Sequence, residues 1–348
     1  MLRYIIRKII NGALVMAGVV VVVFVLFQGF GDPSRMMLGQ SADPATRENI
    51  RKELNLDQPR WKQFLLYLND VSPVSVHTRE GIRQKQLRGI FIGGNYRLAV
   101  KLPYLRRSYQ SRKEVWDILT AALPGTIILA SAAMLLAVLA GIPLGILAAV
   151  KKNTWMDSSS VFVSVLGISA PSFFMAIVIA YVFGFVLSSY TGLSMTGSLF
   201  ETDPFAGRQL QLQNLVLPAV TLGIRPLAVI VQLTRSSMLD VLQQDYIRTA
   251  YAKGLGRQRV LWKHALRNAL NPVITAVTGW FAELLAGAFF VEYIFGWKGM
   301  GKVTVDALEN LDFPVVMGSV LLSSFVFIAI NLFADLLYGI IDPRIRTA

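Results

Sequence analysis

The sequence predicts an all-α membrane protein with six transmembrane helices. Hydrophobic residues make up 54% of its 348 residues, and charged residues make up 16%, against about 25% in typical soluble domains. The mean hydropathy is +0.53. Six apolar stretches reach the length of about 20 residues that a helix needs to cross a bilayer. Together these observations indicate a chain that lies in lipid.

The first predicted helix lies close to the N-terminus. The run Ile9–Phe27 carries no charge and directly follows a short basic segment. It is too long for the core of a signal peptide and lacks a small-residue cleavage pattern, so we expect it to remain in the protein as a helix. This helix and the residues before it form a first segment, 1–28, and a long loop, 29–116, follows.

Two uncharged runs predict the second and third helices. Ile118–Val150 is uncharged, and we expect its helix near 123–149 because Pro124 suits a first helical turn. Residues 158–200 also carry no charge, but apolarity fades at the string SSYTG. One helix near 159–187 is therefore predicted there rather than two.

The last three helices complete a membrane core of residues 117–348 and are expected near 215–235, 272–292 and 313–338. Arg225 interrupts the fourth apolar run, and Glu283 interrupts the fifth. At 1.5 Å per residue, both charges lie about 13–15 Å below the same face of a hydrocarbon core about 30 Å thick. Because unpaired charges are costly at that depth, we expect them either to bridge the two helices or to line a wet translocation path.

The distribution of basic residues predicts the orientation. The short segments on the side of the two termini hold 14 lysines and arginines, and the short segments on the other side hold three. The positive-inside rule then places both termini in the cytoplasm. The loop 29–116 holds 16 basic residues, but loops above about 60 residues translocate regardless of charge. We expect this loop outside, with a helix near 44–54.

A basic segment, 236–271, connects the fourth and fifth helices on the predicted cytoplasmic side. Its first part has an acid at the start and apolar or small residues at helical spacing, which predicts a short amphipathic helix with one face formed by Ile247, Ala250, Tyr251, Gly254 and Leu255. Glycines at 254 and 256 then break this helix. The segment either only fixes the topology or docks a cytoplasmic partner, to which Ala250 and Gly254 would allow close approach.

A second helix, roughly 257–270, is expected after the glycines. Arg259, Lys263 and Arg267 recur every four residues and form one stripe on it. Such a stripe suits the phosphates of membrane lipids. The net charge of +13 does not predict nucleic-acid binding, because the basic residues are interleaved with membrane-length apolar runs and match no nucleic-acid motif.

Short strings that follow one another along most of the chain carry a family resemblance. In chain order they are GDPS (31–34), LNLDQP (54–59), LPGT (123–126), GIPLGILAA (141–149), APSFF (170–174), LPAVTLG (217–223), LTRSSML (233–239), DYIRTAYAKGL (245–255), HALRNA (264–269), VEYIFGWKGMG (291–301) and ADLLYGIIDPRIR (334–346). Together they resemble the transmembrane subunits of binding-protein-dependent ABC importers, in particular the oligopeptide, dipeptide and nickel permease group. Arg248 stands where the general pattern has glutamate, and residues 71–113 make the outer loop longer than usual.

The resemblance implies a type I ABC importer permease fold with a cytoplasmic coupling helix and a large extracytoplasmic loop. It implies that the coupling helix docks into a cleft of an ATPase subunit through Asp245, Tyr246, Arg248, Thr249, Ala250, Lys253, Gly254 and Leu255. The implied partners are a second homologous permease subunit, two ABC ATPase subunits, an extracytoplasmic substrate-binding protein and membrane lipids. The chain itself would hold no cofactor, because ATP and Mg²⁺ would bind to the ATPase subunits. It would translocate a peptide or a related small solute across the cytoplasmic (inner) membrane by alternating access.

The sequence also argues against chemistry in this chain. GWKGMGKVT (296–304) almost matches a phosphate-binding loop, but Val303 occupies the position that needs a hydroxyl group. Its glycines are interpreted as a turn after the fifth helix, and Glu292 just before them is given a structural role. There is no nucleophile–base set for an enzyme, and two distant histidines and no cysteine do not predict a metal site.

One alternative function from another class stays open. A secondary transporter driven by an ion gradient could use Glu283 as its titrating group. Such transporters commonly contain inverted repeats and broken helices. No internal repeat is visible in the sequence, which favours the importer subunit.

Overall fold

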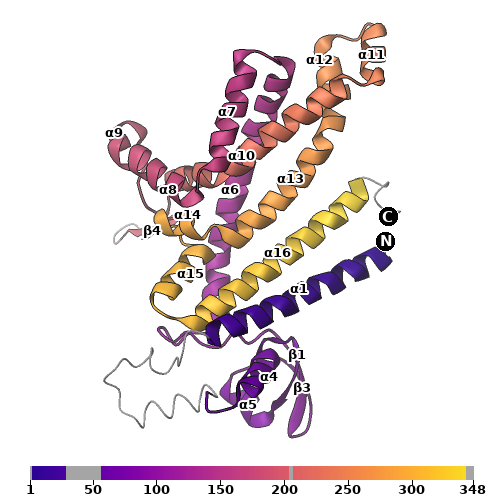
Figure 1. The fold of residues 1–348 in the computed structure, drawn as a ribbon. Helices are drawn as coiled ribbons and strands as arrows, with labels where there is room; N and C mark the ends of the chain where they lie inside the picture. The colour runs from indigo at the N-terminus through magenta and orange to yellow at the C-terminus, as the bar shows by residue number, and fades with distance from the viewer. Residues whose placement is uncertain (1, 29–55, 204–206, 342–348) are drawn as a thin grey trace. The chain divides into compact units, whose positions relative to one another are not determined.

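The computed structural model describes residues 2–28, 56–203 and 207–341 (Figure 1). The chain divides into two compact units. Unit one contains the residues up to Ala122 together with Val303–Phe325, and unit two contains Leu123–Lys302 and the residues from Val326 onward.

Most of the described chain is helical, and several helices are long and apolar enough to cross a membrane. Five helical segments meet this criterion: Ile5–Gln28, Val115–Val150, Gln213–Leu242, Arg257–Ala286 and Phe313–Leu336. A bent pair of shorter helices, Trp155–Ser169 and Ser172–Val186, is a sixth candidate if the two cross together as one span. The predicted all-α membrane fold is therefore confirmed by length and composition, with five to six candidate spans among the described residues.

In chain order the bent pair is the third of these segments. The prediction of a single helix near 159–187 is therefore wrong. Helix α7 (Trp155–Ser169) and helix α8 (Ser172–Tyr181) meet at an angle of 106°. The break lies at Ala170, which is extended with ψ 131°, before Pro171. Proline disfavours a helical conformation in the preceding residue and lacks the N–H that would continue the ladder. A π-helix, η1 (Val182–Val186), and a short helix, α9 (Ser188–Thr191), follow.

Other helices are longer than their apolar runs. Helix α6 spans Val115–Val150, so Pro124 lies inside it rather than in its first turn. The earlier start is stabilised by burial in unit one, where Val115 and Leu119 are fully covered. Helix α10 (Gln213–Leu242) ends seven residues beyond the predicted 235, and α16 (Phe313–Ile341) ends three beyond 338.

The fifth span and the predicted helix at 257–270 are one continuous helical segment. Helix α12 (Arg257–Arg259), π-helix η2 (Val260–Ala265) and helix α13 (Leu266–Gly287) follow without a break. The residues that connect this segment to α10 are therefore only 243–256, rather than 236–271. Helix α13 ends five residues before the predicted 292, and two shorter helices, α14 (Phe289–Ile294) and α15 (Met300–Glu309), precede α16.

Unit one contains a small module between α1 (Leu2–Gln28) and α6, which we call the outer module after its predicted side of the membrane. Helix α4 (Arg60–Val71) is followed by strand β1 (Val74–Thr78), helix α5 (Arg79–Gln84) and strands β2 (Gly89–Gly93) and β3 (Tyr96–Lys101). The strands form an antiparallel sheet in the order β1-β3-β2. The helix expected near 44–54 lies outside the described residues.

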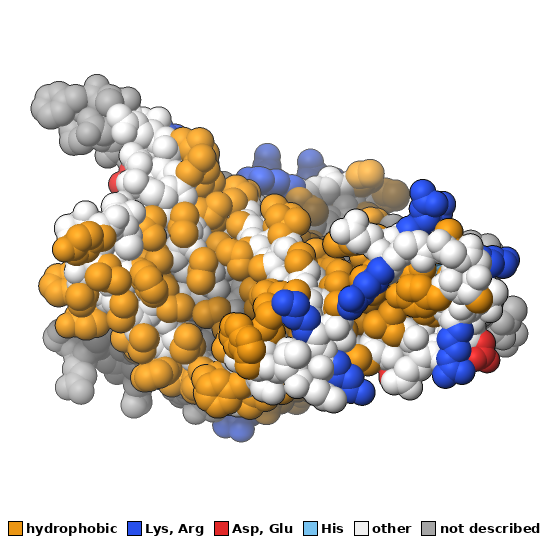
Figure 2. All heavy atoms as spheres, turned by 90° about the horizontal axis from the view of Figure 1, so that it is seen from above, with side chains coloured by type: hydrophobic (Ala, Val, Ile, Leu, Met, Phe, Trp, Pro, Cys, Tyr) orange, Lys and Arg blue, Asp and Glu red, His pale blue; other side chains and the backbone are white. Residues whose placement is uncertain are grey.

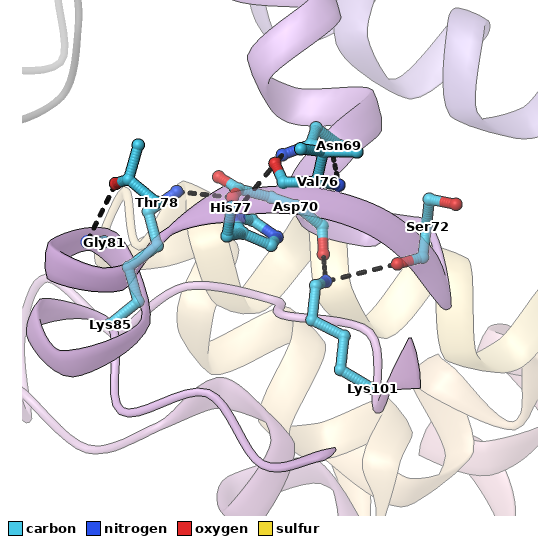
Figure 3. A network of polar contacts seen from close by, with 9 residues as sticks. All are labelled: Asn69, Asp70, Ser72, Val76, His77, Thr78, Gly81, Lys85 and Lys101. Atoms are coloured by element: carbon cyan, nitrogen blue, oxygen red, sulfur yellow. Dashed lines mark hydrogen bonds and ion pairs between the residues drawn. The ribbon is translucent and has the colours of Figure 1, made fainter. Parts of the chain in front are cut away.

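A polar network joins α4 to the covered face of this sheet (Figure 3). The Asn69 side chain exchanges hydrogen bonds with the backbone of Val76, at 2.9 and 3.0 Å. Lys101 is buried and donates to the backbone carbonyls of Asp70 and Ser72, and the Asp70 carboxylate pairs with Lys85. Burial lowers the pKa of Lys101 to about 8, because a low-dielectric environment disfavours the charged form.

The opposite face of the sheet is apolar and exposed. Leu98 is paired with Val76 on one side and with Ile92 on the other, so the three share this face. Every second residue along each strand points the same way. Its exposed members are Val74, Val76, Ile90, Ile92, Tyr96, Leu98, Val100 and Leu102. The module thus keeps a lysine and a histidine inside and exposes a continuous apolar surface.

Unit two packs α6, α8, α10, α13 and α14 around one apolar core that includes Leu129, Ala133, Ile230, Leu285 and Phe295. Close approach of α6 and α10 requires a glycine on α6: a Cβ at Gly141 would lie 2.9 Å from Ile230 Cγ2. Small residues commonly allow such contacts between membrane helices. A hairpin of β4 (Phe200–Asp203) and β5 (Gly207–Leu210) lies between α9 and α10.

Candidate functional site

The segment between α10 and α12 folds into the predicted short helix, α11 (Asp245–Ala252). Helix α10 ends at Leu242, and the extended Gln244 (ψ 147°) turns the chain before α11 begins. Asp245 lies in the first turn, where a carboxylate is favoured by the helix dipole. Its ion pair with Arg248, at 3.6 Å, is solvent-exposed and adds little stability.

One side of α11 packs on its own chain. Ile247 is 1% exposed and Ala250 is 7% exposed. They belong to a small apolar cluster with Met238 on α10 and with Val260 and Ala265 on η2. Burying a side chain such as isoleucine contributes about 1.5–3 kcal/mol, so this cluster fixes α11 to both neighbouring spans.

Ala250 faces this cluster, and its close approach to a partner stays a prediction. Helical spacing predicted that five residues form one face of this helix. Only some of them pack on the chain's own cluster. Tyr251 and Gly254 lie outside the cluster and are exposed, and Leu255 is half-buried against it. A local pattern does not reveal which neighbour covers a stripe.

The other side of α11, its free side, is exposed within the described part of the chain. Its exposed members are Asp245, Tyr246, Arg248, Thr249, Tyr251 and, just beyond the helix, Lys253 and Gly254. Gly254 has φ +79°, and nothing lies within 4 Å of a Cβ built there. Glycine is therefore favoured by the backbone conformation and not by crowding.

Basic side chains continue from α11 onto the helical segment after it. Arg259, Lys263 and Arg267 are exposed, as are Arg248 and Lys253. On the face shown in Figure 2, lysine and arginine side chains gather toward the right-hand side, while hydrophobic side chains cover most of the left. The free side of α11 is thus a polar and basic surface that contains two half-exposed tyrosines, Tyr246 and Tyr251.

A hydrogen bond links this free side to the fifth span. Asn268 Nδ2 on α13 donates to the hydroxyl of Tyr246 over 2.8 Å. The bond and the apolar cluster together connect α11 to α10 and to the start of α13. A force applied to the exposed side of α11 would therefore reach two membrane spans.

The two predicted intramembrane charges do not form an ion pair with each other. Arg225 is half-buried on α10, and its guanidinium lies over the ring of Trp280, 6.0 Å from the centroid. Its Nε atom is buried and has no hydrogen-bond partner among the described residues. Glu283 lies one turn beyond Trp280 on α13 and is exposed. The expected bridge between the helices is thus replaced by a contact between a cation and an aromatic ring.

A buried ion pair near α11 was not singled out from the sequence. Arg235 on α10 donates from Nε and Nη2 to the carboxylate of Asp157 on α7, the second bond at 2.8 Å. Asp157 also accepts from the backbone N–H of Asn153 at 3.0 Å. The available signal was one acid and one base, each next to an apolar run on the same predicted side.

Glu292 is the centre of a second network, and the structural role expected for it is supported. Its side chain is fully buried and accepts hydrogen bonds from the hydroxyl of Thr126 at 2.7 Å and from the backbone N–H groups of Gly301 and Lys302 at 2.7 and 3.2 Å. The glycine-rich loop wraps around this carboxylate, and a Cβ at Gly299 would lie 2.5 Å from Glu292 Cδ. The loop's glycines therefore form a turn around a carboxylate.

Comparison with known proteins identifies the family to which the chain is similar. A family described as "Binding-protein-dependent transport system inner membrane component" matches residues 141–347, and the N-terminal family of such components matches residues 1–81. The dipeptide transport system permease protein DppB of Alkalihalophilus pseudofirmus is 34% identical over 99% of this chain and 100% of its own length. DppB of Escherichia coli K12 is 36% identical over 99% of both chains.

Two further proteins are similar. The glutathione transport system permease protein GsiC of Escherichia coli K12 is 35% identical over 99% of both chains. A solved chain of the MetNI methionine ABC transporter in an inward-facing conformation aligns with 63% of this chain and 96% of its own length, with a TM-score of 0.46 and 14% identity.

The apolar helical fold and the family matches define a multi-pass permease subunit of an ABC importer in the inner membrane. The chain belongs to the family of binding-protein-dependent transport system inner membrane components. The role is transport, as the names of its relatives state for those proteins.

Proposed function

We propose that this chain is a pore-forming subunit that imports small peptides by alternating access. Transport would be driven by ATPase subunits that bind α11. The observation that supports the proposal most directly is the pairing of a free outer side on α11 with an inner side fixed to α10 and α13. A docking helix needs both, because the partner must reach it and its movement must reach the membrane helices.

The proposed assembly contains a second homologous permease subunit, two ABC ATPase subunits and an extracytoplasmic substrate-binding protein. ATP and Mg²⁺ bind to the ATPase subunits, and this chain holds no cofactor of its own. The match to a binding-protein-dependent family supports an outer receptor. Membrane lipids cover the remaining apolar surface, with Arg259, Lys263 and Arg267 near phosphate groups. Nucleic acid is not a partner.

Both termini and α11 lie in the cytoplasm in this proposal. The short segments on the side of the termini hold 14 basic residues, and those on the other side hold three, which supports that orientation. The ATPase contact consists of the exposed residues of α11 and its C-terminal turn, with Leu255 at its edge and Ala250 as an inner support. Closure of the ATPase pair on ATP would displace α11 and thereby reorient α10 and α13.

Small peptides are the proposed substrates, because relatives that cover the whole chain are named as dipeptide and glutathione permeases. Arg225 and Glu283 are proposed to line the path. Each lacks an ion-pair partner within the described chain, so each is available to the charged termini of a peptide or to the second permease subunit.

The test compares two lysine variants in the assembled transporter. Lys253→Glu reverses a charge next to α11, and Lys113→Glu makes the same change at an exposed site of the outer loop. We expect Lys253→Glu to reduce co-purification of the ATPase subunit and ATP-dependent dipeptide uptake into proteoliposomes, and Lys113→Glu to retain the ATPase subunit. Unchanged ATPase binding after reversal of Lys253 together with Tyr251→Asp would contradict the docking role. Uptake by the purified chain without ATP would instead favour an ion-coupled secondary transporter.

A further inference from the structure

Helix α4 in the outer module carries an apolar stripe that no other described residue covers. Trp61 is 65% exposed, Leu65 is 52% exposed and Leu68 is 40% exposed. Their spacing of four and three residues places them on one side of the helix. Arg60 and Lys62 are exposed beside them. A tryptophan–leucine stripe next to basic residues is typical of helices that lie in a membrane interface.

The position of α4 in unit one indicates which surface this stripe meets. The ring of Phe24, in the last turn of α1, packs on Phe64 and Tyr67 of α4, with centroid distances of 5.1 and 5.7 Å. The side chain of Gln28 is hydrogen-bonded to Gln63 at 3.0 Å. Helix α4 is therefore fixed against the C-terminal end of a membrane span.

The depth of this contact follows from two neighbouring spans. Phe27 packs on Phe313, the first residue of α16, at a centroid distance of 5.4 Å, so these two residues mark the same edge of the apolar layer. Phe24 lies one turn deeper, about 4.5 Å at 1.5 Å per residue. The α4 residues that contact Phe24 thus lie at the boundary between hydrocarbon and headgroups.

The stripe continues the lipid-facing surface of α1. Val25 and Leu26 are both more than half exposed on the same last turn of α1. Leu68 lies four residues after Phe64 and three after Leu65, so the stripe is next to the side of α4 that contacts α1. Exposed apolar side chains therefore lie on both helices beside this contact.

We infer that α4 is an interfacial membrane anchor whose Trp61–Leu65–Leu68 stripe inserts into the lipid leaflet at the C-terminal end of α1. In the proposed orientation this is the outer leaflet. Tryptophan favours the headgroup level, and the two leucines reach the upper acyl chains. The anchor would hold the outer module at a fixed height above the span, whichever solute the transporter carries.

The absence of cysteine from the chain makes a clean test available. Nitroxide spin labels are attached to Leu65→Cys and Lys62→Cys in the full chain, reconstituted into phosphatidylglycerol–phosphatidylethanolamine vesicles. Collisions with oxygen, which concentrates in lipid, are compared with collisions with a water-soluble nickel chelate. We expect the oxygen-to-nickel ratio to be several-fold higher at 65 than at 62, because Lys62 lies on the polar side of the same helix.

Two results would overturn the inference. Equal ratios at 65 and 62 would mean that the stripe faces water. Protection of the label at 65 from both reagents would mean that protein covers it. A third label at Ile92→Cys, on the apolar face of the sheet, serves as a comparison: a high ratio at 92 together with a low ratio at 65 would assign the lipid contact to the sheet and also refute the role of α4.

Discussion

Arg235 and Asp157 form a two-bonded ion pair that joins α10 to α7, two turns before α10 ends and the chain turns into α11. The two residues are 78 positions apart in the sequence. It therefore fixes α7 to the same end of α10 that supports the proposed docking helix.

Asp157→Asn should destabilise the protein. Arg235 would lose its charged acceptor while staying largely buried, and a hydrogen bond to a charged group contributes about 1.5–3 kcal/mol. We expect a decrease of several degrees in the unfolding temperature of the detergent-solubilised chain. Asp240→Asn, at an exposed position of the same helix α10, is the matched control. It should change the free energy of unfolding by less than about 0.5 kcal/mol. Equal effects of the two variants would mean that the ion pair adds no stability.

Ile247→Ala should loosen α11 from the two spans. Truncation of a buried isoleucine to alanine costs about 2–5 kcal/mol, whereas Ile→Val costs about 0.5–1.5 kcal/mol. The exposed side of α11 stays chemically intact in both variants. We expect Ile247→Ala to speed proteolysis within 243–256 and to weaken ATPase retention, while Ile247→Val stays close to the wild type. Wild-type protease resistance in Ile247→Ala would show that the cluster does not hold α11.

Tyr246→Phe should separate partner binding from coupling. It removes the hydroxyl that Asn268 binds and retains the ring on the exposed side. One such hydrogen bond contributes about 1 kcal/mol. We expect the ATPase subunit to remain bound while the amount of peptide transported per ATP falls. Tyr251→Phe is the control, because its hydroxyl makes no hydrogen bond within the described chain; the same fall in both variants would refute the role of the bond.

Arg225 and Glu283 should act independently. Residues that are not in contact usually have additive effects, whereas an ion pair gives an interaction energy of about 0.5–3 kcal/mol. We expect Arg225→Gln and Glu283→Gln each to reduce peptide uptake, and the double variant to lose the product of the two factors. Recovery of uptake in the double variant would indicate a direct pair. Full uptake in all three variants would remove both residues from the translocation path.

Glu292 should make stability depend on pH. Burial raises the pKa of its carboxyl from 4.5 to about 7, although three hydrogen bonds oppose the increase. The folded state therefore holds this proton more tightly than the unfolded state, so the contribution of Glu292 to stability is highest below about pH 4.5 and decreases as the pH rises toward 7. We expect the unfolding temperature in detergent to follow this trend.

The matched control for this titration is Glu292→Gln. Its amide oxygen can accept from Gly301 and Lys302, and its amide nitrogen can donate to the Thr126 hydroxyl oxygen. The glutamine variant should therefore fold and lose the part of the pH dependence that lies between 4.5 and 7. An unchanged profile in this variant would assign the titration to another group.

The membrane fold could be predicted from the sequence because length and apolarity alone decide whether a helix spans a bilayer. The positions at which helices break could not be predicted from the sequence. Pro143 and Pro226 lie inside continuous helices, whereas Pro171 follows a break of 106°. The local signal is the same in each case, and the outcome depends on whether neighbouring helices stabilise the kinked or the broken form.

The candidate site was predictable in part for a similar reason. Helical spacing located α11, but it did not show that Ala250 faces the chain's own cluster, because that depends on the path of α10 and η2. The depths of Arg225 and Glu283 agreed with pairing, yet the aromatic ring of Trp280 takes the place of the acid. No strand was predicted at β1 and β3, although their alternating residues match a strand pattern; the apolar residues of that alternation lie on the exposed face.

The reversed polarity of the small sheet has a practical consequence. A fragment cut from residues 56–113 would carry eight large apolar side chains into water on one flat surface, and such surfaces promote aggregation. Attempts to produce this part by itself, as an antigen or for crystallisation, should yield insoluble material. Screens for inhibitors or antibodies against this part should therefore use the intact protein.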